Sequence, residues 1–183
     1  MKLETKRLIL RDITMKDAKD IVKNLNNVKI SRYLLVVPYP YTMKDAKWWV
    51  NECKRKAKEK PRESYSLHIE LKSKKGIIGG VGLSKIDNFQ GTASIGYWLG
   101  EDYWRQGIVS EAVREVLDFA FNKLKLRKVE LYAFAENKAS NALAKKMGFK
   151  LEGKIRKKSR DRATGKIHDD NFYGLLREEW KRR

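Results

Sequence analysis

Apolar positions that recur every three or four residues predict two helices in the first third of the chain. Each predicted helix follows a Thr and an Asp in the spacing of a capping box, Thr14 with Asp17 and Thr42 with Asp45. The apolar face of the first helix consists of Ala18, Ile21, Val22 and Leu25. The face of the second consists of Ala46, Trp49, Val50, Cys53 and Ala57, with Cys53 expected in the core. Between them, residues 33–41 contain two prolines and no helical period, which predicts a loop with a large apolar and aromatic surface.

Alternation of apolar and polar residues predicts strands in the middle of the chain. Residues 7–11 form a short alternating segment. Residues 66–71, 76–83 and 92–99 then follow one another, with a turn around residues 87–91 before the last of them. Three such segments in succession are typical of an antiparallel meander.

The second half of the chain changes period twice. A helix is predicted over about 109–124, from apolar positions at Val113, Val116, Leu117, Ala120 and Leu124. A strand follows at 127–135, so strand, helix and strand form a βαβ unit, which implies a parallel pair. The next helix, about 138–147, has apolar positions at Ala139, Ala142, Leu143 and Met147 and ends at Gly148. Strands near 149–157 and 169–177 close the chain. The class is α/β with a mixed sheet, and no repeat or linker divides residues 1–183, so we expect one domain.

The formal net charge of +19 changes the picture of the surface. Such a charge attracts polyanions, namely nucleic acid, the ribosome or a phosphorylated cofactor. A lysine-rich surface adapted to heat or salt is an equally good interpretation. Basic residues are dense at 54–62 and 154–162.

Other residue types exclude several classes of protein. The single cysteine, Cys53, excludes an intramolecular disulfide and a metal cluster built on cysteine, and the two histidines, His68 and His168, lie far apart in the sequence. No apolar run approaches the roughly 18 residues of a membrane span. The N-terminal residues are charged throughout, unlike a signal peptide. We therefore expect a cytoplasmic protein without a metal site.

A basic turn at residues 102–108 leads from the strand 92–99 into the helix that follows. Helix N-termini carry free N–H donors and a partial positive charge, so they bind phosphate groups readily. Gly107 lets the backbone approach an anion closely, and Arg105 adds charge. The turn contains neither GxxxxGK[ST] nor GxGxxG, which excludes the ATP-type and dinucleotide-type loops.

Four segments together resemble the GNAT family of acyl-CoA-dependent N-acetyltransferases, and most closely its RimJ/RimL-type branch, which acetylates N-terminal amines of ribosomal proteins. These segments are "ETKRLILRD", "IGYWLGEDYWRQGIVSEAV", "YAFAENKASNALAKKMGFKLEG" and "HDDNFYGLLREEW". The resemblance implies a mixed sheet that splays between its fourth and fifth strands, here 92–99 and 127–135. The pantetheine arm of acetyl-CoA is then expected in the gap, and its pyrophosphate on the turn that follows.

The resemblance also implies which residues bind acetyl-CoA. The family turn [Q/R]-x-x-G-x-[G/A] falls on Trp104, Arg105, Gln106, Gly107, Ile108 and Val109. Only Gly107 matches; Trp104 replaces the first polar residue and Val109 a small one. Trp98 and Leu99 are expected to offer backbone groups to the pantetheine, although an aromatic residue at position 98 is equally typical of a core.

Asn137 and Ser140 match the family's N-x-x-S at the start of the next helix. Many members protonate the departing thiolate with a Tyr at the position of Ala144, so the resemblance assigns that role to Ser140. The alternative for both residues is helix capping. Where the branch has a Glu that acts as the general base, this chain has Ser159. The other candidate bases, each also interpretable as a solvated or paired group, are Asp161, Asp169, Glu70, Glu136, His68 and His168, and both histidines lie in patterns typical of a surface.

The expected activity is direct transfer of an acetyl group from acetyl-CoA to a primary amine, most closely the N-terminal α-amine of a protein or peptide, including a ribosomal protein. Two alternatives stay open: acetylation of a small amine such as a polyamine, drug or amino acid, and a ribosome- or nucleic-acid-binding protein without turnover. The expected partners include ribosome or RNA at the basic surface and no membrane. A homodimer stays open.

Overall fold

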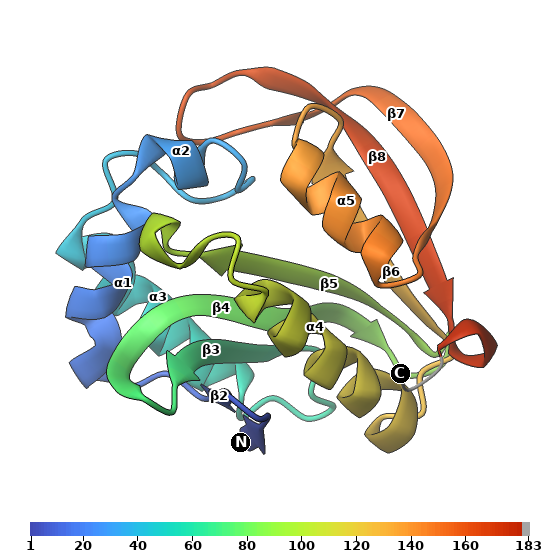
Figure 1. Ribbon diagram of the computed structural model, residues 1–183, viewed down its shortest axis with the longest axis horizontal. Coiled ribbons are helices and arrows are strands. Elements are labelled where there is room, and N and C mark those ends of the chain that lie inside the picture. Colours follow the sequence, from blue (N-terminus) through green and yellow to red (C-terminus); the bar gives the residue numbers. More distant parts are fainter. Residues whose placement is uncertain (181–183) are drawn as a thin grey trace.

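The computed structural model describes residues 1–180 and shows one eight-stranded mixed sheet in the order β1-β2-β3-β4-β5-β6-β8-β7 (Figure 1). The strands are β1 (Lys2–Glu4), β2 (Leu8–Arg11), β3 (Tyr65–Leu71), β4 (Lys74–Asp87), β5 (Thr92–Leu99), β6 (Lys128–Phe134), β7 (Lys150–Arg160) and β8 (Ile167–Leu176). The helices are α1 (Ala18–Leu25), α2 (Val28–Ser31), α3 (Met43–Lys56), α4 (Ile108–Asp118) and α5 (Lys138–Lys146). The predicted mixed α/β class is confirmed.

The parallel pair of β5 and β6 is short, and this opens the sheet. Pairing covers Thr92–Ser94 of β5 and Lys128–Glu130 of β6, after which the two strands separate. The other neighbours are antiparallel: β4 stays paired with β5 as far as Leu99, and β8 stays paired with β6 as far as Phe134. The meander and the splay between 92–99 and 127–135 are therefore confirmed.

Helices cover both faces of the sheet (Figure 1). On one face, α4 and α5 bury apolar side chains against the strands, with Leu117 and Ala144 among them. On the other face, α1 and α3 pack together, and Cys53 lies in that core as predicted. Within residues 1–180, we find no helix with the length and apolar content needed to cross a membrane.

The structure differs from the sequence predictions at several elements. β1 and the single turn α2 were not predicted, because segments of three and four residues are too short to show a period. The predicted helix 109–124 is regular only to Asp118, and Phe119–Lys123 continues it as a π-helical turn. On α5, Ala139 and Ala142 are exposed, and Ala144 is buried in place of them. Gly148 follows this helix with φ +91°, as expected for its end.

Asp17 does more than the predicted capping. Its carboxylate accepts a hydrogen bond from the Thr14 backbone N–H at 2.8 Å and pairs with the Arg11 guanidinium at 2.8 Å. Burial raises the pKa of the Asp17 carboxyl, but the hydrogen bonds from Arg11 and Thr14 outweigh it and hold the pKa at about 2. The pair therefore ties β2 to the start of α1.

Replacing Asp17 with Asn is expected to destabilise the protein by about 1–2 kcal/mol at pH 7. Because the folded pKa lies below the ordinary value of 3.8, the ionised carboxylate stabilises the fold above pH 4, and this contribution is lost as the pH falls towards 2. Urea unfolding of both proteins between pH 2 and 8 tests this. The difference in unfolding free energy should shrink below pH 4; a difference independent of pH would contradict the assignment.

Candidate active site

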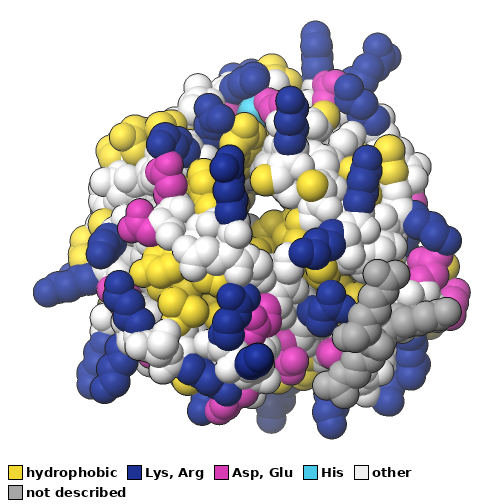
Figure 2. Space-filling model, viewed as in Figure 1, with side chains coloured by type: hydrophobic (Ala, Val, Ile, Leu, Met, Phe, Trp, Pro, Cys, Tyr) yellow, Lys and Arg dark blue, Asp and Glu magenta, His cyan; other side chains and the backbone are white. Residues whose placement is uncertain are grey.

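A cleft of about 850 Å³ opens where β5 and β6 separate. Figure 2 shows a hollow near the centre of the face drawn, with hydrophobic side chains at its bottom and Lys and Arg side chains around it. The cleft is lined by residues from the diverging strands, the turn before α4, the start of α5, and α2 with its following loop, including 95–99, 131–134, 103–105, 107–110, 136–140, 29–30 and 33–35. The predicted cofactor turn and the predicted catalytic helix start thus meet in one cavity.

Strand pairing decides which backbone groups of β5 face the gap. The Gly100 N–H donates to the Ile78 carbonyl at 2.8 Å, and Trp98 lies opposite Gly80. In an antiparallel pair, alternate residues direct both backbone groups at the partner strand, so Trp98 directs its groups at β4. The expectation that Trp98 offers its backbone to the cofactor is therefore wrong, although the residue lines the cleft. Tyr97 and Leu99 direct theirs into the gap.

The turn before α4 has the geometry of an anion site. Arg105 and Gly107 adopt left-handed conformations, with φ of +61° and +73°. A Cβ added to Gly107 would meet only the Arg7 guanidinium, at 3.6 Å, so the space beyond the turn is open. The N–H groups of the first turn of α4 have no carbonyl partner within the helix. Arg105 and Lys138 line the cleft, and neither has an ion pair among the described residues. These features fit a pyrophosphate.

The remaining residues of the turn hold its shape. The Trp104 indole N–H donates to the Leu99 carbonyl at 2.9 Å, which takes up one of the backbone groups facing the gap. Ile108 is buried in the core, and Val109 packs partly against it. Gln106 does not line the cleft: its side chain donates to the Asp102 carbonyl, and its own carbonyl accepts from Arg7 at 3.0 Å.

Ser140 reaches into the cleft and meets an aromatic hydroxyl from the opposite strand. The Ser140 Oγ and Tyr97 Oη atoms share a hydrogen bond at 2.8 Å. Burial raises the pKa of the Tyr97 hydroxyl to about 12, although the hydrogen bond with Ser140 lowers it, so the hydroxyl carries its proton. Asn137 caps α5, because its Oδ1 accepts from the Ser140 N–H at 3.1 Å. Ala144 is 1% exposed and faces the core, so this position offers no group to the cleft.

Tyr97 was missed by the sequence analysis. An aromatic residue in a strand is typical of core packing, and the sequence does not show that Tyr97 has a hydrogen-bond partner 43 residues away. Lys138 and Asp170 were missed as well, because each lies in a run of polar residues at the start of a predicted element. Asp170 is 4% exposed, lines the cleft and accepts a hydrogen bond from Ser159, whose Oγ lies 2.7 Å away.

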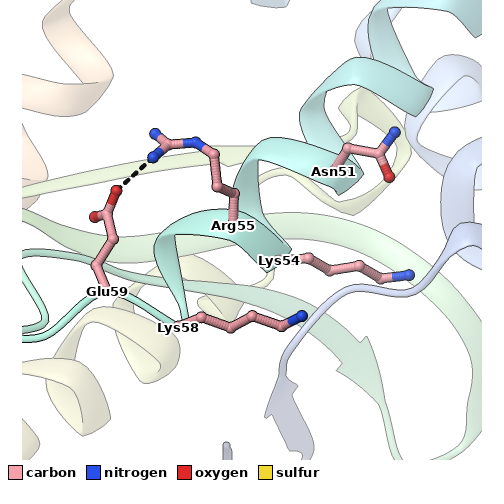
Figure 3. Close-up of a pocket in the computed structure, with 5 residues that line it drawn as sticks. All are labelled: Asn51, Lys54, Arg55, Lys58 and Glu59. Atoms are coloured by element: carbon pink, nitrogen blue, oxygen red, sulfur yellow. Dashed lines mark hydrogen bonds and ion pairs between the residues drawn. The ribbon is translucent and has the colours of Figure 1, made fainter.

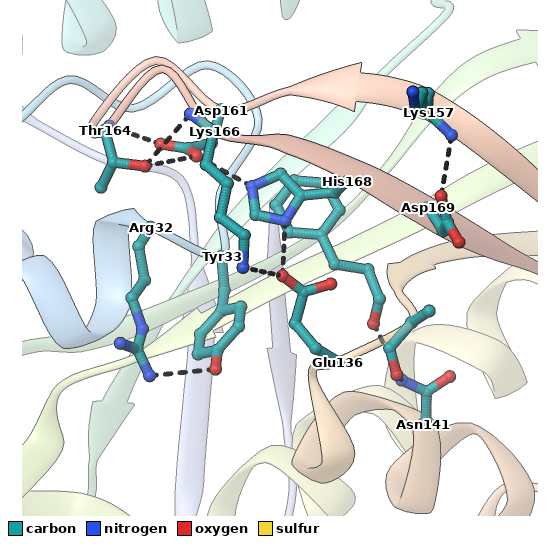
Figure 4. Close-up of polar contacts among 12 residues, drawn as sticks. Arg32, Tyr33, Glu136, Asn141, Lys157, Asp161, Thr164, Lys166, His168 and Asp169 are labelled. Carbon is teal, nitrogen blue, oxygen red and sulfur yellow. Dashed lines mark hydrogen bonds and ion pairs between the residues drawn. The ribbon is translucent and has the colours of Figure 1, made fainter.

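Three of the candidate bases form one network, drawn in Figure 4. His168 places Nδ1 2.7 Å from Glu136 Oε1 and Nε2 2.8 Å from Asp161 Oδ2. Hydrogen bonding by Lys166 is the main cause that lowers the pKa of Glu136, to about 2. Burial raises the pKa of Asp161, but hydrogen bonds from His168 and Thr164 bring it to about 2. Carboxylates with such low pKa values are poor proton acceptors.

The other candidates are engaged elsewhere. Asp169 accepts from the Lys157 N–H and pairs with Lys154, and Glu70 pairs with Arg11. His68 and His168 are 2% and 4% exposed, so the surface positions expected for both histidines are wrong. His68 accepts from the Trp49 indole of α3 at 3.2 Å, and burial lowers its pKa to about 4.

The basic segments do not form one site. Residues 54–59 end α3 and the turn after it, where Lys54, Arg55 and Lys58 project around a shallow surface depression and Arg55 pairs with Glu59 at 2.6 Å (Figure 3). Most side chains of β7, at the sheet edge, are exposed. Charged side chains on an edge strand oppose pairing with other chains.

Comparisons with known proteins agree on one family. The family model "Acetyltransferase (GNAT) domain" matches residues 7–150. The uncharacterised N-acetyltransferase YoaA of Bacillus subtilis is 31% identical over 175 residues, 96% of each chain. The ribosomal-protein-serine acetyltransferase of Escherichia coli is 33% identical over 100 residues, 55% of each chain. Among solved structures, the microcin C7 self-immunity acetyltransferase MccE in complex with acetyl-CoA and AMP is 25% identical, with a TM-score of 0.80 over 94% of this chain and 93% of that one.

Proposed function

Since this chain belongs to the GNAT acetyltransferase family and is an N-acetyltransferase that uses acetyl-CoA, we propose that its acceptor is the α-amine at the N-terminus of a protein or peptide. The similarity to a ribosomal-protein-serine acetyltransferase supports this class of acceptor. With a ribosomal protein as acceptor, the reaction belongs in the cytoplasm, and the basic surface is available for contact with ribosomal RNA. Enzymatic turnover is a property of the family, so the interpretation as a protein without turnover is set aside.

The observation that carries the proposal is the composition of the cleft. Its walls are largely apolar and aromatic, with Tyr33, Leu34 and Leu35 from the loop after α2 on one side. Such a surface fits the apolar and main-chain atoms of an extended peptide. A polyamine instead requires several carboxylates, and this cleft is lined by two acidic residues, Glu136 and Asp170, beside Lys29, Arg105 and Lys138. The net charge of +19 also disfavours a polycation.

The acidity of the acceptor supports the same conclusion. An α-amine has a pKa of about 7.7–8.0, so roughly 15% is neutral at pH 7, whereas a lysine side chain with a pKa of about 10.4 is roughly 0.04% neutral. Only the neutral amine has the lone pair that forms the new bond. With the same assistance from the site, an α-amine is therefore favoured over a lysine side chain, because a larger fraction of it is neutral.

We assign the residues of the cleft as follows. The first turn of α4, with Gly107 and Arg105, binds the pyrophosphate of acetyl-CoA. The backbone groups of Tyr97 and the Leu99 N–H face the gap and are available to the pantetheine, whereas the Leu99 carbonyl is held by Trp104. An N–H on β5 meets the oxygen that becomes negatively charged. Ser140, in contact with Tyr97 and held by the Asn137 cap, supplies a proton towards the departing sulfur.

A peptide with a free α-amine is expected to be acetylated at least fivefold more efficiently than the same peptide with a blocked N-terminus. Both peptides carry one lysine, so the comparison separates the two amines within one sequence. Spermidine is the third acceptor, and kcat/KM with saturating acetyl-CoA is measured for each. Equal values for the free and blocked peptides would remove the α-amine preference. Faster turnover of spermidine would favour the small-amine alternative.

A further inference from the structure

Asp170 is a buried carboxylate that lines the cleft and has one oxygen without a partner in the described part of the chain. It lies on β8 opposite Phe134 of β6, and its side chain is 4% exposed. Oδ2 accepts the hydrogen bond from Ser159 at 2.7 Å, whereas Oδ1 is buried and has no hydrogen-bond partner among residues 1–180. Within the same part of the chain, no Lys, Arg or His lies within ion-pair distance of Asp170.

This arrangement is unfavourable without a ligand. Leaving a buried acceptor unsatisfied costs about 1–3 kcal/mol, and more when the group is charged. Buried carboxylates in folded proteins are normally paired or fully hydrogen-bonded. A ligand that brings N–H donors on a positive group into the cleft would remove this penalty. A primary ammonium has both the charge and the donors.

The unused oxygen distinguishes Asp170 from the other acidic residues nearby. Glu136 binds Lys166 and His168, and Asp161 binds His168 and Thr164. Each of those carboxylates already has protein donors. Two acidic residues of the described chain, Glu136 and Asp170, line the cleft. Of these two, Asp170 is the one that is buried and has an acceptor oxygen without a partner within residues 1–180.

Strand alternation places Asp170 on the side of the sheet away from α5. Asn171 and Tyr173 share one face of β8. Their side chains each donate a hydrogen bond to the Asn141 side chain of α5, at 2.7 Å. Side chains of successive strand residues point to opposite faces, so Asp170 points to the other face. On that side the turn after β7 contacts the loop after α2, where the Arg162 N–H donates to the Leu35 carbonyl at 3.2 Å. The cofactor turn and α5 therefore approach the cleft from one side, and Asp170 approaches it with the loop from the other.

We propose that Asp170 binds the ammonium group of the acceptor and takes one of its protons, a role that rests on the proposed transfer of an acetyl group to an amine. An N–H bond of the ammonium breaks and the O–H bond of the Asp170 carboxyl forms, which leaves a neutral amine. The amine lone pair then forms the C–N bond with the acetyl carbon while the C–S bond to CoA breaks. Of the two protons that the ammonium loses, one passes from Asp170 to water and the other ends on the thiol of CoA. Ser159 holds Asp170 in place as a positioning residue.

The test compares wild type with Asp170→Asn, which keeps the shape of the side chain and removes its charge. The acceptor is whichever primary amine wild type acetylates fastest among a free N-terminal peptide, free lysine and spermidine. At pH 7, kcat/KM for the acceptor is expected to fall roughly 100- to 1,000-fold, the lower part of the range of about 100- to 10,000-fold for general acid–base catalysis. The difference in kcat/KM between the variant and wild type should narrow as the pH rises to 9.5, because more of the amine is then neutral in solution. Acetyl-CoA affinity, measured by calorimetry, should stay within twofold of wild type.

The matched control is Asp169→Asn, the next residue on the same strand, whose carboxylate faces Lys154 and Lys157. Its kcat/KM should stay within threefold of wild type. Unchanged activity of Asp170→Asn at pH 7, or a deficit that is the same at every pH, would overturn the role of Asp170 alone. A wild type that acetylates none of the amines would instead overturn the proposed function on which that role rests.

A second measurement keeps the proposal testable if Asp170→Asn does not fold. Wild type is titrated with the best acceptor and with its analogue in which a hydroxyl replaces the amine. The ammonium compound should bind at least tenfold more tightly at pH 6.5, because only it supplies a positive donor to Oδ1. Equal affinities would show that no carboxylate in the cleft binds the ammonium, and would overturn the proposal.

Discussion

Replacing Ser140 with alanine is expected to lower kcat by roughly 10- to 1,000-fold, the range for losing one proton donor or hydrogen bond in a transition state. The hydroxyl lies in the cleft, 2.8 Å from the protonated hydroxyl of Tyr97. Asn137 still caps α5 in the variant, because the cap uses the Ser140 backbone N–H. The KM for acetyl-CoA should therefore change little, which is the signature of an interaction made mainly in the transition state.

Single-turnover kinetics check this result, since they isolate the chemical step from product release. Tyr97→Phe is the informative companion variant, because it leaves Ser140 in place and removes the hydroxyl that contacts it. We expect a smaller loss than in Ser140→Ala, of about 3- to 30-fold. Ser94→Ala, on β5 where that strand still pairs with β6, is the control for loss of a serine hydroxyl. Wild-type single-turnover rates in Ser140→Ala would return Ser140 to a purely structural role.

A tyrosine at position 144 is not expected to restore the rate that Ser140→Ala loses. The resemblance places the usual tyrosine at Ala144, but this residue is 1% exposed and packs in the core. A tyrosine ring there would overpack the interface between α5 and the sheet, which typically costs about 1–3 kcal/mol. We therefore expect Ala144→Tyr to destabilise the protein without restoring the rate.

Replacing Gly107 with aspartate is expected to weaken acetyl-CoA binding by about 10- to 300-fold, or about 1.4–3.4 kcal/mol. The turn is open, so the new carboxylate has room and would lie beside the anion that the turn is proposed to bind. Two like charges about 4 Å apart repel by about 4 kcal/mol at the effective dielectric constant near a protein surface. Calorimetry with acetyl-CoA at low and moderate salt measures the loss, which should diminish with salt because exposed charges are screened.

The matched control is Gly107→Asn. Asn has nearly the same size as Asp and tolerates the left-handed conformation that Gly107 adopts at φ +73°. The two variants therefore share their effects on strain and volume and differ in charge. Gly107→Asn should lose less than fivefold in affinity. If both folded variants bind acetyl-CoA equally, the turn before α4 does not hold its pyrophosphate.

Local features of this chain were predictable because they depend on neighbours in the sequence. The capping boxes at Thr14 and Thr42, the strand 92–99 and the left-handed stop at Gly148 each involve groups within a few residues of one another. The same holds for the turn at Gly107, whose place between a strand and a helix follows from two periods. The family followed from four such segments in their order, and the comparison with known families confirms it.

The contents of the cleft depend on pairing across the sheet. Periodicity shows that a residue lies on one face of its element, but it does not show which faces meet. The contact of Ser140 with Tyr97, and that of Ser159 with Asp170, arise only because β5 and β6 separate and β7 pairs with β8.

By itself, the sequence determined the order of the longer helices and strands and the turn at Gly107, since short-range geometry and local hydrogen bonds fix both. The resemblance of four segments identified the family. The tertiary structure alone decided that His68 and His168 are buried and that Trp98 directs its backbone at β4. It also decided that Asp170, which lines the cleft, keeps one buried oxygen unpaired within residues 1–180. The reason is physical: burial and the supply of hydrogen-bond partners are properties of surfaces brought together by folding, and residues far apart in the chain contribute those surfaces.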